Sequence, residues 1–484
     1  MRKQTKLVAV LSAAALLAIG ASMTSFAATG WQEENGSWVY YNKDGDQVTD
    51  TWAKSGERWF YLNSDGEMAT DELIDDGTNY YYVNSDGAMV TNAWIAIDNE
   101  NAGDEDEPDA YWYYFQANGK AYKSTESASF KTINGKKYAF DSEGKMLYGW
   151  VNKDDATRIT GSEAWQSGDY YCGDENDGAR ASGWLKLDVV KDDEDKSFWF
   201  YFNPSNGKKY AADENETYAI KTINSKKYAF DDQGVMKDGW TDTLATEAQV
   251  ATITEYQYFN GADEGWRLQK GWVKVVPAKD VNETAHEDDS TKWYYADGSG
   301  KIYNEVLKTI NNKKYAFNSK GEMLSGVWAL NVQSDGRIVG DMIEVDNADK
   351  FNKVKTLNPK NYAVYYFGSG DDGAAKTGNQ TIDIDGDNYS YSFGTTGQNK
   401  YKGVSETKKT LLVMGRKIKA DKDYKYQAFK ADGTYVENPT TPDNAYLVNT
   451  SGTIMKNKKD VKDADGKHYE TNEYGQVVRT WWKN

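Results

Sequence analysis

A short turn motif recurs at a fixed interval near the N-terminus, and this repetition restricts the possible folds more than any other feature of the sequence. The motif ends at Gly45, Gly66 and Gly87, so successive copies lie 21 residues apart. An aromatic run such as Trp38–Tyr41 precedes each turn, and an apolar residue such as Met68 follows it. Two β-rich runs joined by Asp-Gly predict a hairpin, because both residues tolerate the positive φ of tight turns. Self-similarity at this period predicts a solenoid.

A longer period lies over the short one. The segment 131–140 returns at 221–230 and at 308–317, at spacings of 90 and 87 residues. Other landmarks keep the same step: Trp94, Trp184 and Trp272; Trp150, Trp240 and Trp328; Met146, Met236 and Met323. One small hairpin cannot bury both of its faces, so its neighbours must supply the core. We therefore predict an all-β solenoid of stacked β-hairpin repeats of roughly 20 residues.

Three regions follow from these patterns. We assign 1–27 to a signal peptide and 28–377 to hairpin repeats, in which three tandem blocks of about 90 residues follow the N-terminal units. After 377 the pattern weakens, although pieces such as Tyr389–Phe393 still predict strands. Residues 378–484 are therefore expected to form divergent repeats, or else a separate small C-terminal β domain.

The N-terminus predicts secretion. Arg2, Lys3 and Lys6 precede an apolar run from Leu7 to Ile19, and Ala27 closes a stretch of small residues. This order is typical of a signal peptide that is removed after Ala27. The apolar run is well short of the roughly 20 residues that span a bilayer. We expect a secreted protein at the cell wall or cell surface, with no membrane span after removal of the signal and no covalent attachment.

The composition restricts the partners. The chain has a formal net charge of -18, and loss of the signal takes it to -21. Nucleic acid is therefore not expected as a partner, because binding it relies on clustered Lys and Arg. The chain has 17 Trp, 36 Tyr and 15 Phe against a single Cys, so rings rather than disulfides must build its core.

Acidic loops interrupt one hairpin of each block. They contain Asp104–Glu107, Asp192–Asp195 and Glu287–Asp289. None has the spaced Asp and Gly pattern of a dedicated calcium loop, and neither does Asp383–Asp387. We expect solvated acidic loops, with weak calcium binding as the alternative, and no metal site or cofactor.

The residues needed for nucleophilic catalysis are scarce. The two histidines, His286 and His468, are expected on exposed loops or strands. Cys172 aligns with Phe259 and Phe367 of the other blocks, which predicts a small buried hydrophobe. Paired carboxylates of a glycoside hydrolase remain an alternative, because a chain with 75 Asp and Glu always offers pairs. We expect a protein that is not an enzyme.

The repeat units resemble the choline-binding or cell-wall-binding repeats of Gram-positive surface proteins. Their pattern of Gly-Trp, Trp-Tyr-Tyr, a turn Gly and Met is visible in Gly271-Trp272 with Trp293–Tyr295 and Gly300. Thr51-Trp52 with Trp59–Tyr61, Gly66 and Met68 has the same order. The units beginning Lys131-Thr132-Ile133 are similar to the related repeats of clostridial toxins and streptococcal glucan-binding proteins.

The resemblance implies ligand sites between neighbouring hairpins, where Trp and Tyr, often with a Met, enclose a quaternary ammonium. A soft cation over ring faces gains about 0.5 to 2 kcal/mol per contact. Alternate rings of each strand must point inward, so any one ring is a core candidate as well. The cage candidates that match the motif are Trp52, Trp59, Tyr61, Tyr82, Trp94, Trp112, Tyr114, Trp184, Trp199, Tyr201, Trp272, Trp293 and Tyr295.

These observations predict a non-catalytic secreted surface protein that binds the cell wall non-covalently. The expected partner is a cell-wall polymer, either a choline-bearing teichoic acid or a polysaccharide. Two alternatives stay open at this point. The repeats could bind glucan or another oligosaccharide, because aromatic platforms also stack on sugars, or they could form the scaffold of a structural or host-contact surface protein.

Overall fold

The computed structural model describes residues 29–482, apart from 105, 153, 214–215, 243–251, 269, 401 and 406. The expected signal peptide, 1–27, lies outside the described residues, and so does Glu105 of the first acidic loop. The chain divides into two units: unit 1 runs up to Lys221 and includes Phe230–Met236, and unit 2 comprises Thr222–Ala229 and everything from Lys237 onward.

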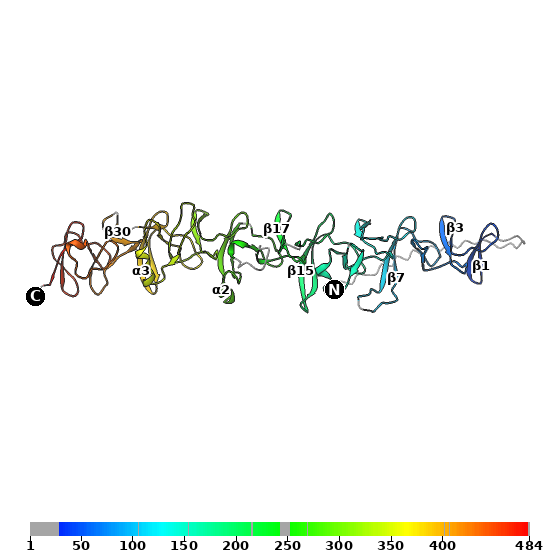
Figure 1. The fold of residues 1–484 in the computed structure, drawn as a ribbon, viewed down its shortest axis with the longest axis horizontal. Coiled ribbons are helices and arrows are strands. Elements are labelled where there is room, and N and C mark those ends of the chain that lie inside the picture. Colours follow the sequence, from blue (N-terminus) through cyan, green and yellow to red (C-terminus); the bar gives the residue numbers. More distant parts are fainter. Residues whose placement is uncertain are drawn as a thin grey trace. The chain divides into compact units, whose positions relative to one another are not determined.

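In its described residues, unit 1 is a succession of antiparallel two-stranded sheets, with one three-stranded sheet and one one-turn helix (Figure 1). The helix is α1 (Ala164–Ser167). The strand pairs are β1 (Gly30–Glu34) with β2 (Ser37–Tyr41), β3 (Thr51–Ser55) with β4 (Arg58–Leu62), β5 (Glu72–Asp75) with β6 (Tyr80–Val83), β7 (Ala93–Asp98) with β8 (Ala110–Phe115), β9 (Lys131–Ile133) with β10 (Lys136–Tyr138), β11 (Trp150–Asn152) with β12 (Thr157–Ile159) and β13 (Tyr170–Tyr171), and β14 (Gly183–Lys191) with β15 (Glu194–Phe202). The division between the units falls within β16 (Ala219–Ile223) and β17 (Lys226–Phe230).

Unit 2 continues the hairpins and then builds larger sheets. Its strand pairs are β18 (Gly239–Asp242) with β19 (Tyr256–Phe259), β20 (Gly271–Val275) with β21 (Lys292–Ala296), β22 (Val306–Ile310) with β23 (Lys313–Phe317), and β33 (Tyr426–Phe429) with β34 (Tyr446–Asn449). The four-stranded sheet has the strand order β25 (Ile343–Glu344), β24 (Val327–Leu330), β26 (Ala363–Tyr366), β29 (Gln398–Asn399). The five-stranded sheet has the order β27 (Gly378–Ile384), β28 (Asp387–Phe393), β32 (Arg416–Lys417), β31 (Leu411–Val413), β30 (Lys402–Val404). The three-stranded sheet has the order β35 (Val461–Lys462), β36 (Lys467–Thr471), β37 (Val477–Trp482). The helical segments are η1 (Ile253–Glu255), α2 (Glu283–Glu287), α3 (Ala348–Thr356) and η2 (Thr441–Asp443).

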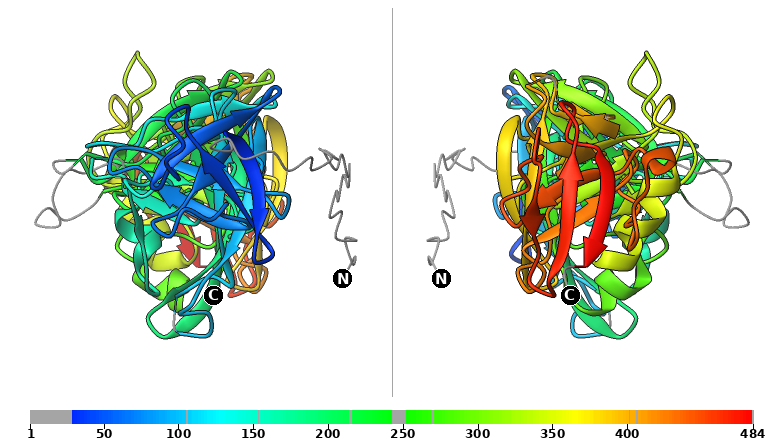
Figure 2. Two further views of the ribbon diagram at one scale, coloured as in Figure 1. Left: turned by 90° about the vertical axis from the view of Figure 1, so that its right-hand side faces the viewer. Right: turned by 90° about the vertical axis from the view of Figure 1, so that its left-hand side faces the viewer.

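The predicted all-β fold of repeated short hairpins is confirmed. The end-on views in Figure 2 show the N-terminal hairpins, in blue, pointing in different directions, and the antiparallel pair of β36 and β37, in red, side by side. None of the described helices is long and apolar enough to cross a membrane.

The position of the main hairpin differs from the sequence-based expectation. The aromatic strand β4 pairs with the strand before it, β3, over five residue pairs. After the Asp65-Gly66 turn only an isolated bridge forms, between Leu62 and Met68. The Asn63 side chain accepts hydrogen bonds from the backbone amides of Asp65 and Glu67, so only Gly66 needs a positive φ, of 76°. The Asp-Gly turn therefore follows the second strand of a hairpin and begins the connection to the next hairpin.

Methionines that follow these turns connect one hairpin to the hairpin before it. The backbone amide of Met89 donates to the carbonyl of Trp59 over 2.8 Å, and that of Met323 to the carbonyl of Trp293 over 2.9 Å. The same bond joins Met146 to Trp112 and Met236 to Trp199. These bonds fix the register between neighbouring hairpins and explain why Trp and Met recur with the same period.

The acidic loops adopt three different structures. Between β7 and β8 the loop is irregular, and between β20 and β21 it contains α2. Asp192 and Asp193 instead form a tight turn at the tip of β14 and β15, both with positive φ. Among the described residues, no group of three or more His, Cys, Asp or Glu is arranged to hold a metal ion.

Rings and small aliphatic side chains make the cores of both units. Cys172 is fully buried with Ala139, Leu147 and Val151, as its alignment with the buried Phe259 and Phe367 predicts. In unit 2 a single cluster joins residues on both sides of 378, from Val327 in β24 to Val413 in β31 and Ile454 beyond it. The C-terminal strands from β27 to β32 therefore share a core with the preceding repeat.

Candidate functional site

Each hairpin of the predicted binding type pairs a Trp on its first strand with a Tyr directly opposite on its second. Trp52 faces Tyr61, and Trp94 faces Tyr114, with ring centroids 5.2 Å apart in both pairs. The centroids of Trp184 and Tyr201, and those of Trp272 and Tyr295, are 5.0 Å apart. All four pairs are edge-to-face, the arrangement that aromatic quadrupoles prefer.

A third ring comes from the next hairpin along the chain. Trp94 contacts Tyr138 at 4.9 Å, and Trp272 contacts Tyr315 at 4.8 Å. The equivalent neighbour of Trp52 is Tyr81, at 5.2 Å. Each of these three Trp residues therefore lies between two hairpins.

In three of the hairpins the second predicted Trp borders the same cluster. Trp199 is 6.3 Å from Trp184, and Trp293 is 6.1 Å from Trp272, both nearly perpendicular. Trp112 packs in one cluster with Trp94 and Met146. These contacts define four aromatic clusters, which we name by their central residues: the Trp52, Trp94, Trp184 and Trp272 clusters.

Tyr82 lies apart from the other twelve predicted cage residues. It faces Leu73, which stands where the other hairpins have Trp, and its ring packs 6.1 Å from Phe115. Its neighbour Tyr81, which sequence analysis missed, is the ring that reaches Trp52. The sequence does contain a sign of this difference: side chains alternate along β6, so Tyr81 and Tyr82 must point to opposite faces of the strand.

Lysines stand over the outer tryptophans of three clusters. The Nζ atoms of Lys54, Lys186 and Lys274 lie 5.7, 5.8 and 5.8 Å from the ring centroids of Trp59, Trp199 and Trp293. Each Lys is the cross-strand partner of its Trp. Trp59 is 40% exposed, so its outer face is open to the solvent.

An acidic residue borders the Trp272 cluster. Asp371 accepts from Lys274 Nζ over 2.8 Å, and this hydrogen bond holds the pKa of the Asp371 carboxyl below its usual range. Because Lys274 lies over Trp293, the carboxylate adds a negative potential beside the rings.

A related cluster around Trp150 is already occupied by a cation of the protein itself. Lys209 stands at the position that Met68 and Met89 hold in other repeats, since it bridges Phe202 as they bridge Leu62 and Val83. Its Nζ lies 5.0 Å from the ring centroid of Trp150 and 5.8 Å from that of Phe200. It also donates to the carbonyl of Trp165 over 2.7 Å. Burial lowers the pKa of Lys209 to about 8.

The histidines differ from each other in their surroundings. His286 lies exposed in α2 and contacts the carbonyl of Pro277 through Nδ1 at 2.8 Å. His468, expected on the surface, is instead buried, because its ring stacks on Trp481 and its Nδ1 pairs with Asp460. That prediction was wrong because the isolated sequence gave no sign of the β36–β37 pairing that covers the ring.

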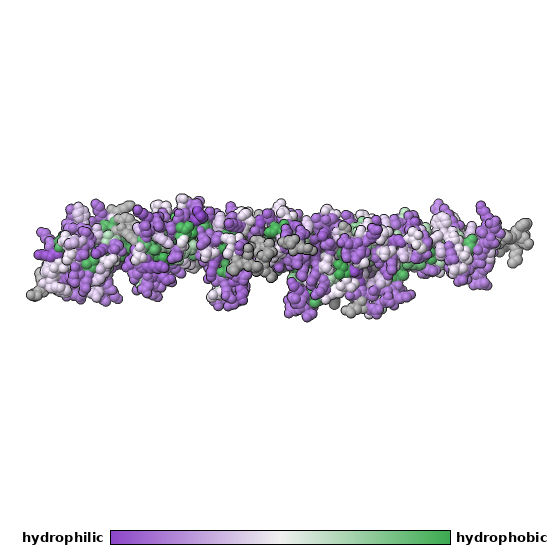
Figure 3. All heavy atoms as spheres, in the orientation of Figure 1, coloured by the Kyte–Doolittle hydropathy of each residue, from purple (hydrophilic) through white to green (hydrophobic). Residues whose placement is uncertain are grey.

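The face of the molecule seen in Figure 3 is mostly polar. On this face strongly hydrophobic residues show only as small separate patches.

Two family models match the chain at these hairpins. The model described as "Choline-binding repeat" matches residues 49–94, which include Trp52, Trp59, Tyr61 and Trp94. The model described as "Putative cell wall binding repeat" matches residues 287–302, which include Trp293 and Tyr295.

Similar proteins come from streptococci. Glucosyltransferase-S of Streptococcus mutans serotype c is 29% identical over 372 residues, which cover 75% of this chain and 20% of that protein. The chain thus spans about a fifth of the length of this curated relative. Among solved structures, CbpJ of Streptococcus pneumoniae TIGR4 is 20% identical with a TM-score of 0.37, over 72% of this chain and 99% of the other. The choline-binding domain of CbpL from Streptococcus pneumoniae is 24% identical with a TM-score of 0.30, over 50% of this chain and 98% of the other.

Proposed function

We propose that this chain, which carries choline-binding and cell-wall-binding repeats, is a non-catalytic secreted surface protein that holds a choline-bearing wall polymer. The ligand group is a quaternary ammonium bound at the Trp52, Trp94, Trp184 and Trp272 clusters. The rest of the polymer stays outside the rings, and no bond is made or broken.

The observation that carries this proposal is the place of Lys209. The chain itself sets an ammonium group against Trp150 and Phe200, at a position where other repeats have Met. A ring cluster of this architecture therefore has room for an ammonium group beside its ring faces, in spite of the cost of burying its charge. Where Met stands at the position of Lys, as at Met146 and Met323, the protein places no ammonium group at that position. The ammonium group of an external ligand can then bind there.

The positive charge of the ammonium group is opposite in sign to the net charge of the chain. The chain carries a formal net charge of -18, which attracts cations and repels anions at long range. A quaternary ammonium has no N–H to satisfy, so ring faces can bind it without a hydrogen-bonding partner. Each single site of this kind is weak, and several sites that engage one polymer together gain affinity through their high effective concentration.

Retention on an immobilised choline analogue tests the proposal. The mature chain should be retained and then released by free choline, and Trp94→Ala and Trp272→Ala should each elute at lower choline concentration. Trp482→Ala is the matched control, because Trp482 is 60% exposed on the last strand and belongs to none of the four clusters. Equal elution of all variants, or no retention of the folded mature chain, would refute the proposal.

Glucan binding is the second candidate. The specific observation in its favour is the similarity over 372 residues to a protein named as a glucosyltransferase. Ring faces that bind ammonium can also stack on sugars. Retention on cross-linked dextran, released by soluble dextran and indifferent to choline, would favour this candidate over the first.

A further inference from the structure

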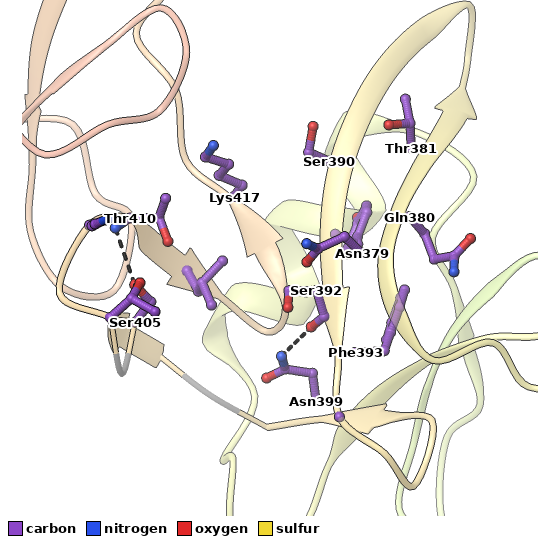
Figure 4. Close-up of a pocket in the computed structure, with 15 residues that line it drawn as sticks. Asn379, Gln380, Thr381, Ser390, Ser392, Phe393, Asn399, Ser405, Thr410 and Lys417 are labelled. Carbon is purple, nitrogen blue, oxygen red and sulfur yellow. Dashed lines mark hydrogen bonds between the residues drawn. The ribbon is translucent and has the colours of Figure 1, made fainter.

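A polar hollow lies over the five-stranded sheet of unit 2, far along the sequence from the Trp272 cluster. Its volume is about 740 Å³, within the usual range of small-molecule sites. Figure 4 shows Asn379, Ser390 and Ser392 on the paired strands β27 and β28, with Lys417 and Thr410 across the hollow.

The pairing of the strands explains why this face is polar. Asn379 pairs with Ser392 and Thr381 pairs with Ser390, so these side chains share one face of the sheet. Their neighbours Ile382 and Tyr391 point the other way, into the core. Alternation thus sends one row of side chains inward and presents a row of hydroxyl and amide groups to the hollow.

The polar groups on this face are available to a ligand. The side chains of Asn379, Thr381 and Ser390 make no hydrogen bond within the described part of the chain, although their backbones are paired. Lys409 and Lys417 likewise form no ion pair there. Burial and the nearby Lys419 lower the pKa of Lys417, so an anion in the hollow would relieve an unfavourable charge.

The local charge is opposite in sign to that of the whole chain. Residues 398–419 contain seven Lys and Arg and one acidic residue, in a chain whose formal net charge is -18. Two of these lysines line the hollow, and none of its described lining residues is Asp or Glu. Such a concentration of positive charge over a hydroxyl-rich surface is unusual for this chain and matches an anionic, hydroxylated ligand.

We propose that this hollow binds a negatively charged oligosaccharide segment. Asn379, Thr381 and Ser390 hydrogen-bond sugar hydroxyls, while Lys409 and Lys417 pair with the carboxylate or phosphate groups that the sugar carries. The site uses none of the aromatic clusters, so it is independent of choline binding. In a wall polymer that bears both charges, the two kinds of site would hold different groups of the same chain.

Calorimetric titration of the full mature chain tests this assignment with three probes. Tetragalacturonate carries carboxylates, a glycerol phosphate oligomer carries phosphodiesters, and maltotetraose is neutral. At least one anionic probe should bind, and which of the two binds identifies the anionic group. Maltotetraose should not bind here, and binding should weaken as salt concentration rises.

Two double variants make the comparison specific. Lys409→Gln with Lys417→Gln should weaken binding of the anionic probe at least tenfold, and Thr381→Val with Ser390→Ala should weaken it several-fold. Lys400→Gln with Lys408→Gln is the matched control, because it removes the same charge from the same basic segment without touching the lining. This control should change binding less than twofold.

Several results would overturn the assignment. One is an equal loss of affinity in the lysine variant and in its control. Others are equal binding of the neutral sugar, or no binding of either anionic probe. Equally tight binding of an oligothymidylate would also overturn it, because it would indicate a general polyanion surface. Retention on the choline analogue is measured on the same variants. It should be unchanged, so failure of this site and failure of the proposed choline binding are distinguishable.

Discussion

Lys209 sets its ammonium 5.0 Å from the ring centroid of Trp150, beside a cluster that is otherwise apolar. The lysine is 5% exposed and replaces the Met of other repeats. Under the proposed function, one substitution in a repeat array changes a site for an external cation into one that supplies its own. It also makes the stability of the surrounding repeats depend on pH.

The pH dependence follows from the lowered pKa of Lys209. The pKa is about 8 in the folded chain against 10.5 for an ordinary Lys side chain, so the unfolded chain binds more protons between these two values. The unfolding free energy should therefore rise with pH above about 8, and below that pH the folded state carries the full penalty, up to about 3 kcal/mol. Asp169, Asp231 and Asp232 partly offset the burial.

The test is urea unfolding from pH 7.5 to 9.5. Lys209→Met should abolish most of the rise, and Lys208→Met, on an exposed neighbour, should keep it. Measurements stop below pH 10 because buried tyrosines, such as Tyr365 with a pKa raised to about 12, destabilise the fold once their unfolded counterparts ionise. Identical pH profiles for the wild type and Lys209→Met would contradict the effect of burial.

Gly373 should not tolerate a side chain. A Cβ at this position would lie 2.2 Å from the Sδ atom of Met323, and the residue has a φ of 60°. Gly373→Ala should therefore destabilise unit 2 by about 1 to 3 kcal/mol, through strain at positive φ and displacement of the Met. Thermal unfolding measures this. Gly370→Ala is the control, because its φ of 57° is similar but nothing lies within 4 Å of its Cβ; an equal loss in both variants would assign the effect to φ alone.

Ser225 occupies a turn position that favours glycine. Asn224 and Ser225 have φ values of 49° and 65°, whereas the same turn of the first block uses Asn134 and Gly135 at 49° and 82°. Ser225→Gly should raise stability by about 0.5 to 1 kcal/mol, and Gly135→Ser should lower it by a similar amount. Denaturation curves of the two variants measure both changes in stability. A change in the same direction for both variants would exclude the φ explanation.

Cys172 should be unreactive in the folded chain. It is fully buried, and burial raises the pKa of its thiol to about 12. Thiolate is the reactive form, so an aromatic disulfide reagent at pH 8 should label it only after unfolding. Spectrophotometric titration with and without urea gives the answer, and rapid labelling of the native protein would mean that the core around Ala139 and Val151 opens readily.

The residues that sequence analysis could place are those whose environment is set by the repeat. Trp94 and Trp272 recur with fixed neighbours, and the structure brings each against the Tyr expected from its own hairpin. Cys172 was likewise assigned to the core through its alignment with Phe259, and both are fully buried. Comparing the repeats with one another gives the information that an alignment of homologues would give, because all copies of one unit must pack in the same way.

Sequence patterns are least informative where one copy differs from its siblings. Tyr82 stands at the motif position that Tyr61 holds in the preceding hairpin, but its cross-strand partner is Leu73, where the other hairpins have Trp. Lys209 and His468 are polar residues in buried positions, and each contacts a partner from another segment of the chain, the carbonyl of Trp165 and the carboxylate of Asp460. Hydrogen bonds of this kind depend on which segments meet, which local patterns do not specify.

By itself the sequence determined that the chain is a series of aromatic hairpins and which tryptophans recur, since the period of side chains along strands and the turn residues are local properties. Only the tertiary structure decided which ring of the next hairpin completes each cluster, where a lysine already fills one, and that Lys409 and Lys417 gather over a polar sheet face. The physical reason is that cation–ring contacts and pockets act over a few ångströms between segments, so they exist only once the register of neighbouring hairpins is fixed.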